Sequence, residues 1–174
     1  SAFTKKLLSI PMAHEMVGFY TIPDDSDGVL KVMRSYQYFA ASAISDKVLR
    51  TNWTRSEQHG GYIWHTTGSG KTMTSFKAAQ LIANSKEADK VVFLLDRVEL
   101  GDQSLINYRN FADPSESIQA TEDTNVLIGK LKSDSPDDVL IVTSIQKMSR
   151  IREDSDVKQK DLEKIQSKHI VFII

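Results

Sequence analysis

Apolar residues occur along this chain as short continuous runs separated by stretches with helical periodicity. Runs of four or five apolar residues are typical of strands buried on both faces, and they occur at 91–95, 139–142 and 170–174. The shorter run 62–64 predicts one more strand. Helices are predicted over 33–50, 71–84, 99–110 and 126–131, with a polar, solvated helix over 154–168. This alternation predicts an α/β fold with a parallel sheet, helices on both of its faces and right-handed crossovers.

Two of these predicted helices have an apolar face that should contact the core. In the first helix this face consists of Tyr36, Phe39, Ala40, Ala43, Ile44 and Val48. In the second it consists of Met73, Phe76, Ala79 and Ala83. Residues 21–29 are acidic and rich in turn-forming residues, so they are predicted to form a loop.

The composition limits the classes of function. The chain has 174 residues, 40% of them hydrophobic and 26% charged, which is ordinary for a globular domain with a real core. The absence of cysteine excludes disulfides and thiolate metal sites and fits a cytoplasmic protein, and the apolar runs are too short for a membrane span. The 22 basic and 23 acidic residues are balanced. Any nucleic-acid contact therefore uses a local groove or other parts of the protein.

The segment 65–72 is the strongest chemical signal. Gly70, Lys71 and Thr72 match the phosphate-loop pattern G-x-x-x-x-G-K-[ST], with His65 in place of the first glycine. Glycines allow successive N–H groups to point at phosphate oxygens, and the following helix adds its positive end. The predicted strand before the loop and helix after it favour a nucleotide site over an accidental glycine-rich turn. For His65 we favour packing over phosphate contact.

A glutamine ahead of the loop is a candidate adenine reader. Gln37, in the segment Arg34-Ser35-Tyr36-Gln37, has an amide that can pair with both N6 and N7 of adenine. The alternative is a surface glutamine on an amphipathic helix. The presence of a phosphate loop in the same chain favours the adenine interpretation.

Polar residues follow the predicted strands at 91–95 and 139–142, at the ends where ligands of parallel sheets bind. Arg97 can contact a phosphodiester, or it can form a surface ion pair with Asp96 or Glu99. Ser144 and Lys147, together with Thr143, are suited to phosphate contacts, but Thr and Ser here can equally cap a helix. Both alternatives stay open at both places.

These four segments, in this order, resemble the superfamily 2 helicases and translocases, and most closely the motor (R) subunit of type I restriction enzymes. The stretch 60–72 is similar to that family's motif I, including Trp64-His65. Residues 93–100 with Gln103 resemble motif Ia, and residues 143–147 resemble the next motif. Residues 34–37 with Ala40 resemble the adenine-reading segment, so the resemblance covers roughly residues 31–174.

The resemblance implies that residues 31–174 form the first of two RecA-like domains that clamp ATP, preceded by a connector at 1–30. It implies a motor driven by ATP and Mg²⁺ along double-stranded DNA, together with modification and specificity subunits and a separate nuclease domain. ATP would be bound by Arg34, Gln37, Thr67, Gly68, Ser69, Gly70, Lys71 and Thr72. Lys71 and Thr72 would be catalytic, with Thr72 on Mg²⁺. Arg97, Ser144 and Lys147 would contact DNA.

In the family the pattern continues with Asp-Glu-Ala-His after the strand that corresponds to residues 170–174, and this chain stops at Ile174. The arginine finger belongs to the second domain. Residues 1–174 alone are therefore expected to bind nucleotide without hydrolysing it. The alternatives are another superfamily 2 helicase or remodeller acting on DNA or RNA, and a small-molecule P-loop kinase. A kinase usually has its loop near the start of the chain. Docking of residues 1–30 on a neighbouring domain is compatible with the motor interpretation.

Overall fold

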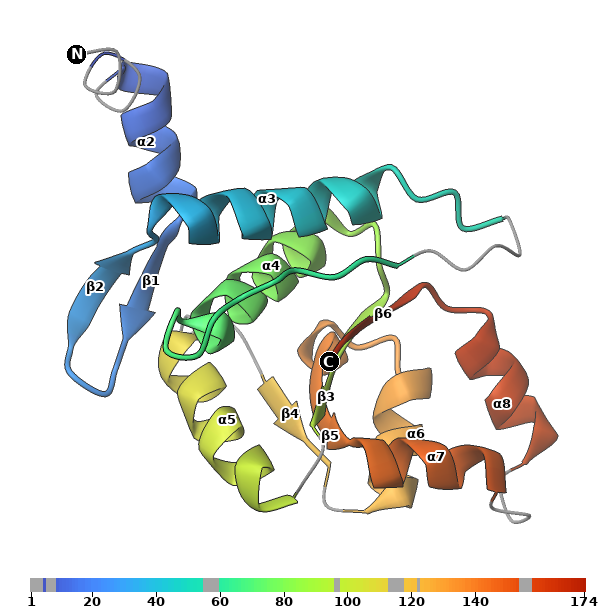
Figure 1. Ribbon diagram of the computed structural model, residues 1–174. Coiled ribbons are helices and arrows are strands. Elements are labelled where there is room, and N and C mark those ends of the chain that lie inside the picture. Colours follow the sequence, from blue (N-terminus) through green and yellow to red (C-terminus); the bar gives the residue numbers. More distant parts are fainter. Residues whose placement is uncertain are drawn as a thin grey trace.

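The computed structural model describes residue 5 and residues 9–54, 60–95, 98–112, 118–121, 123–153 and 158–174. Helices and strands alternate through most of this chain (Figure 1). The elements are, in order, α2 (Ile10–Phe19), β1 (Thr21–Asp24), β2 (Val29–Val32), α3 (Ser35–Leu49), α4 (Lys71–Ser85), β3 (Lys90–Leu95), α5 (Val98–Phe111), β4 (Ile118–Ala120), α6 (Thr124–Lys132), the 3-10 helix η1 (Pro136–Asp138), β5 (Leu140–Ser144), α7 (Ile145–Glu153), α8 (Gln159–Gln166) and β6 (Ile170–Ile173).

The central sheet is parallel and has the strand order β4-β5-β3-β6. In its register, Val91 of β3 lies opposite Leu140 of β5 on one side and Val171 of β6 on the other. Consecutive strands are joined through helices, so their carboxyl ends meet at one edge of the sheet. The parallel α/β arrangement predicted from the sequence is confirmed.

Alternate residues of the strands face two separate cores. Val91 and Phe93 of β3 pack with α4 and α5, and the rings of Phe93 and Tyr108 are 4.2 Å apart. Val92, between them, packs on the opposite face with Leu127 of α6 and with residues of α7 and α8. Figure 1 shows these two groups of helices on the two sides of the sheet. This explains why β3 and β5 read as continuous apolar runs.

The helix α3 packs mainly on α4. Its buried side chains are small or polar, namely Gln37, Ala40, Ala41 and Ser45. The helix is where the sequence predicts it, but the predicted apolar face is wrong in part, because Phe39 is 67% exposed. Small residues allow the two helices to approach closely, and hydrophobicity alone does not identify such a face. The predicted face of α4 is confirmed, since Phe76 and Ala79 are fully buried.

The N-terminal part of the chain contains structure that the apolar pattern did not predict. Residues 21–29 are not a continuous loop, because β1 and β2 pair as an antiparallel hairpin with its turn at 25–28. Gly28 closes the turn at φ 68°, a conformation that glycine adopts without strain. The pair Asp27-Gly28 is a hairpin signal in the sequence, and the loop prediction did not take it into account.

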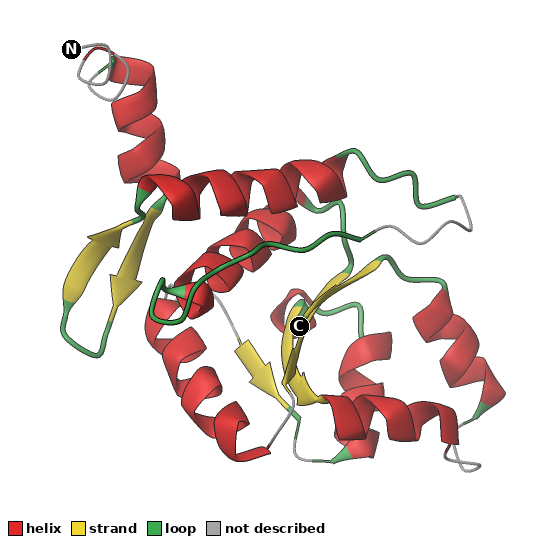
Figure 2. Ribbon diagram, viewed as in Figure 1, coloured by secondary structure: helices red, strands yellow, loops and turns green. Residues whose placement is uncertain are grey.

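Two predicted strands differ from the structure. Residues 62–64 do not form a strand. They belong to the loop that precedes α4 (Figure 2), and Tyr62 and Trp64 are each 89% exposed. The strand β6 is present at 170–173, but among the described residues it pairs only with β3, and it is not fully buried, since Phe172 is 43% exposed. A strand at the edge of a sheet lacks the second neighbour that would cover it.

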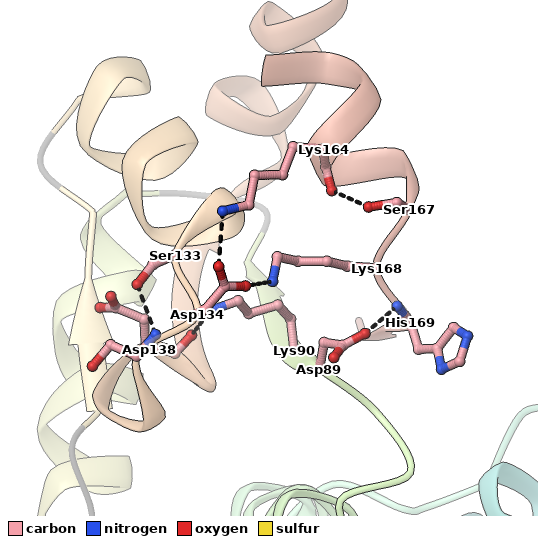
Figure 3. Close-up of polar contacts among 10 residues, drawn as sticks. Asp89, Lys90, Ser133, Asp134, Asp138, Lys164, Ser167, Lys168 and His169 are labelled. Atoms are coloured by element: carbon pink, nitrogen blue, oxygen red, sulfur yellow. Dashed lines mark hydrogen bonds and ion pairs between the residues drawn. The ribbon is translucent and has the colours of Figure 1, made fainter. Parts of the chain in front are cut away.

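A cluster of charged groups lies at the amino ends of the strands. We call Asp89, Lys90, Asp134, Lys164 and Lys168 the amino-end cluster (Figure 3). Asp134 accepts from Lys164 at 2.8 Å and from Lys168 at 2.6 Å, and these hydrogen bonds lower the pKa of Asp134 to about 2. Lys90, only 1% exposed, donates to the Asp138 carbonyl at 2.7 Å. Burial lowers the pKa of Lys90, and the charge of Lys168 lowers it further.

Backbone contacts of Asp89 complete the cluster. The Asp89 carboxylate accepts from the His169 N–H at 2.7 Å, and the Asp89 N–H donates to the His169 carbonyl at 2.8 Å. The start of β6 is thereby fixed to the start of β3, while Asp134 links α8 to the connection between α6 and η1. These contacts fix the position of the edge strand at its amino end.

Candidate functional site

The predicted phosphate loop immediately precedes α4. Within it, the Ser69 N–H donates to the Thr66 carbonyl at 3.3 Å and forms a tight turn. Lys71 is the first residue of α4 and is exposed, while Thr72 is half-buried. The first N–H groups of a helix have no partners within the helix, and the helix dipole makes this end positive. The loop and the start of α4 therefore suit an anion.

Glycine is required at position 70. Gly70 has φ 80° and stands at the N-cap of α4. A methyl group at this position would overlap the Nε2 atom of Gln37. Gly68 also has a positive φ of 77°, but the space around it is open. Two features therefore favour glycine at position 70: the left-handed conformation of its backbone and the close approach of Gln37 from α3.

The beginning of α3 holds the loop through one carbonyl group. The Ser69 carbonyl accepts from the Tyr36 hydroxyl at 3.0 Å and from Gln37 Nε2 at 3.1 Å. Gln37 Oε1 in turn accepts from the Arg34 N–H at 2.8 Å, which caps α3. Gln37 is only 5% exposed, so it is not a surface glutamine. Its amide nitrogen joins α3 to the phosphate loop while its amide oxygen caps α3, a double role that the sequence does not indicate.

His65 also contacts the loop. Its Nδ1 atom is 3.0 Å from the Ser69 hydroxyl, and that hydroxyl donates to the Thr66 carbonyl at 2.7 Å. The ring lies edge-on to Tyr36 with centroids 6.0 Å apart. We predicted a packing role for His65, and the structure adds a polar contact within the loop. In the sequence, the replacement of the motif's first glycine by His65 is the feature that could have pointed to this contact.

A cavity of about 470 Å³ lies beside the loop. It is lined by Arg34 and Tyr36 at the start of α3, by Trp64 and His65, and by residues 66–69. The cavity therefore brings together two segments that the sequence marks independently, residues 34–37 and the phosphate loop.

Two of the predicted DNA-contact residues, Ser144 and Lys147, lie elsewhere, at the carboxyl end of β5 and the start of α7. Arg97 lies outside the described residues. Ser144 is 6% exposed, and its hydroxyl accepts from the Lys147 N–H at 3.3 Å, which is a helix cap. Lys147 Nζ donates to the Thr121 carbonyl at 2.5 Å. Thr143 is buried and bonded to the Thr121 hydroxyl. Of the two roles that the sequence leaves open for Ser144, the structure shows the capping role.

The described residues contain no group of three or more His, Cys, Asp or Glu side chains placed to hold a metal ion. None of the helices within the described part of the chain is long and apolar enough to cross a membrane.

Comparison with known proteins gives one family. Residues 36–174 match the model of the SWI2/SNF2 ATPase family. The chain is 37% identical over 172 residues to the type I restriction enzyme SsaAORF53P endonuclease subunit of Staphylococcus saprophyticus. That alignment covers 99% of this chain and 17% of the relative.

A second similar protein is shorter. It is the C-terminal part of the putative type I restriction enzyme MpnIIP endonuclease subunit of Mycoplasma pneumoniae. The two chains are 42% identical over 153 residues, covering 85% of this chain and 72% of the relative. A more distant relative, from Methanocaldococcus jannaschii, is 27% identical over 124 residues. Since the chain spans only 17% of the Staphylococcus relative, the comparison reaches a limited part of that protein.

Proposed function

Because the chain belongs to the SWI2/SNF2 ATPase family, we propose that residues 65–72 bind the phosphates of ATP within the motor of a type I restriction enzyme that moves along double-stranded DNA. The observation that carries this proposal is the geometry at Gly70, where a left-handed glycine starts α4 directly before Lys71. The names of these relatives, which are type I restriction enzyme endonuclease subunits, support the assignment to such a motor.

Each group of the loop has a definite task in this proposal. The N–H groups of residues 67–70 surround phosphate oxygens, and Lys71 places its charge on the β- and γ-phosphates. The Thr72 hydroxyl would hold Mg²⁺, which would neutralise phosphate charge. The exposure of Lys71 and the half-buried position of Thr72 at the start of α4 fit these tasks.

The base of ATP is proposed to bind at the start of α3. Arg34 lines the cavity beside the loop, and Gln37 follows it by one helical turn. The Gln37 amide is bonded to the Arg34 N–H and the Ser69 carbonyl, so pairing with adenine requires it to exchange these partners. In this proposal Gln37 couples base recognition to the position of the loop.

We further propose that the domain is RecA-like. The parallel order β4-β5-β3-β6 and the helix that begins directly after the loop support this proposal. Residues 1–30 are proposed to form a connector ahead of this domain, with its limit inside β2 (Val29–Val32). ATP hydrolysis, translocation on DNA and association with modification and specificity subunits are proposals for the complete protein.

The proposal is tested by nucleotide binding to the complete protein. Isothermal titration with ATP and Mg²⁺ should show binding by the unmodified protein and none by Lys71→Ala. Lys86→Ala is the matched control, because Lys86 is also exposed and stands at the opposite end of α4. Equal affinity in the Lys71→Ala and Lys86→Ala proteins would refute the assignment of the loop.

A further inference from the structure

The imidazole of His65 occupies the position where phosphate loops of the G-x-x-x-x-G-K-[ST] type have their first glycine. A glycine there contributes only backbone freedom, whereas a histidine brings a ring with two nitrogen atoms. In this structure one of these atoms, Nδ1, is 3.0 Å from the Ser69 hydroxyl. The other, Nε2, is buried and has no hydrogen-bond partner among the described residues.

The direction of the His65 contact follows from counting hydrogens. A serine hydroxyl has one hydrogen. The Ser69 hydroxyl donates it to the Thr66 carbonyl at 2.7 Å. The hydroxyl can therefore only accept from His65, so the hydrogen of that contact resides on Nδ1. The result is a chain of two hydrogen bonds across the loop. His65 Nδ1–H donates to the Ser69 hydroxyl, and this hydroxyl donates to the Thr66 carbonyl.

Ser69 is the point at which the loop is held from both sides. Its side chain is bonded to His65, and its carbonyl accepts from Tyr36 and Gln37 of α3. The neighbouring residues 66–68 are exposed. The orientation of Ser69 thus sets the orientation of the adjacent N–H groups.

We propose that His65 is a positioning residue, whose Nδ1–H fixes the Ser69 hydroxyl and so holds the phosphate loop in its binding conformation. The effect on nucleotide affinity rests on the proposed function. The tautomer of His65 and its contact with Ser69 are independent of that function. In this role a side chain can replace His65 if it supplies a donor at the Nδ1 position. A side chain that only fills the volume of the ring cannot replace it.

The first measurement needs no nucleotide. Long-range ¹H–¹⁵N correlation spectra of histidine-labelled protein should show His65 with its hydrogen on Nδ1. In Ser69→Ala this preference should be lost, because the acceptor is gone. A hydrogen on Nε2 alone in the unmodified protein would overturn the inference, whether or not the protein binds nucleotide.

The second measurement compares substitutions by ADP titration of the complete protein. The amide nitrogen of His65→Asn lies close to the place of Nδ1, so this variant should bind within about twofold of the unmodified protein. His65→Phe keeps the ring volume and His65→Gln reaches the Nε2 position. Each of these two should bind about 2- to 10-fold more weakly, the worth of one neutral hydrogen bond. In a Ser69→Ala background these losses should disappear.

Two outcomes of this titration would contradict the positioning role. If His65→Asn is as weak as His65→Phe, or if the losses add to that of Ser69→Ala, His65 acts by packing and the inference is wrong. Absence of ADP binding by the unmodified protein would instead refute the proposed function, and the tautomer would still decide the inference.

Discussion

The two ends of α4 lie in regions that use their polar groups in opposite ways. At its C-terminal end, next to the amino ends of the strands, the charged groups of the amino-end cluster are satisfied by each other and by backbone groups. At its N-terminal end, residues 66–68 and Lys71 are exposed. In the first region hydrogen-bonding capacity is used for the fold. In the second, where these residues are exposed, we propose that it serves a ligand.

This difference separates the substitutions that should affect stability from those that should affect binding. The amino-end cluster fixes an edge strand that has a neighbour on one side only. The phosphate loop depends on a few contacts from α3, which hold it without filling the space beside it. Substitutions in the cluster should change the free energy of unfolding, and substitutions in the loop should change nucleotide affinity.

After the complete loss expected for Lys71→Ala, the largest effect is expected from Gly70→Ala. The left-handed conformation costs a residue with a Cβ atom about 1–2 kcal/mol, and overpacking against Gln37 costs about 1–3 kcal/mol more. We expect ATP to bind about a hundredfold more weakly, measured by calorimetry. Gly28→Ala is the control, because φ is 68° there and the space is open. It should lower stability and leave affinity unchanged. Normal ATP binding by Gly70→Ala would mean that the loop is not the site.

A smaller effect is expected from Gln37→Ala, which tests whether α3 contributes recognition of the base or only support. If Gln37 pairs with adenine, the unmodified protein should bind ATP more tightly than GTP by about 1–3 kcal/mol. The variant should lose this difference and bind both nucleotides more weakly. If the ATP to GTP ratio is unchanged while both affinities fall, Gln37 only joins α3 to the loop.

The amino-end cluster is tested through the pH dependence of the stability of the Asp134→Asn variant. Because the pKa of Asp134 is about 2 in the folded protein and 3.8 is the ordinary value for the side chain, the unfolded chain binds the proton more readily. The stabilisation is therefore complete above about pH 4 and is lost as the pH falls toward 2. Urea unfolding should show the variant to be slightly less stable at pH 7, with the difference vanishing near pH 2. The effect is small because the Asp134 side chain is 70% exposed.

A matched control distinguishes this ion pair from general surface charge. Asp46→Asn also removes an exposed carboxylate, but its contact with Arg50 is 3.9 Å long and lies within one helix. This variant should show a smaller change in stability than Asp134→Asn. The same pH profile in both variants would show that net charge, and not the link between α8 and the α6–η1 connection, is responsible. Neither substitution should change nucleotide affinity.

The smallest effect is expected for DNA binding at the carboxyl ends of β3 and β5. Loss of one phosphate contact should reduce the slope of log affinity against log salt by about one. We expect this for Arg97→Ala and for Lys147→Ala in the complete protein, measured by fluorescence anisotropy with duplex DNA. An unchanged slope in Lys147→Ala would restrict Lys147 to its contact with the Thr121 carbonyl.

The fold could be predicted where a segment's environment is visible in its own sequence. β3 and β5 are covered on both faces and have neighbours on both sides, so their apolar runs are continuous. The short strand β4 and the helices α2 and α7 were not predicted. The helix α2 has no buried residue, and its apolar residues Ile10, Val17 and Phe19 are exposed, so no periodic face marks it.

The position of the loop could be predicted from the sequence, but its contacts could not. The spacing of Gly70, Lys71 and Thr72 was sufficient to place a loop directly before a helix, and its phosphate chemistry stays a prediction. The bonds from Tyr36 and Gln37 to Ser69 join residues more than 30 positions apart. They depend on the packing of α3 on α4 through small side chains, and no local pattern records that approach.

The two tryptophans lie in different environments, so their fluorescence can report separately on the edge strand and on the cavity. Trp53 is stacked on His169, with ring centroids 4.6 Å apart and planes within 10°, while Trp64 is 89% exposed beside the cavity. Since the chain contains no other tryptophan, Trp53→Phe and Trp64→Phe each leave a single fluorophore. The emission of Trp64 should be red-shifted and accessible to iodide, and ATP should change it. The emission of Trp53 should be quenched by the imidazole and should report the release of β6 during unfolding.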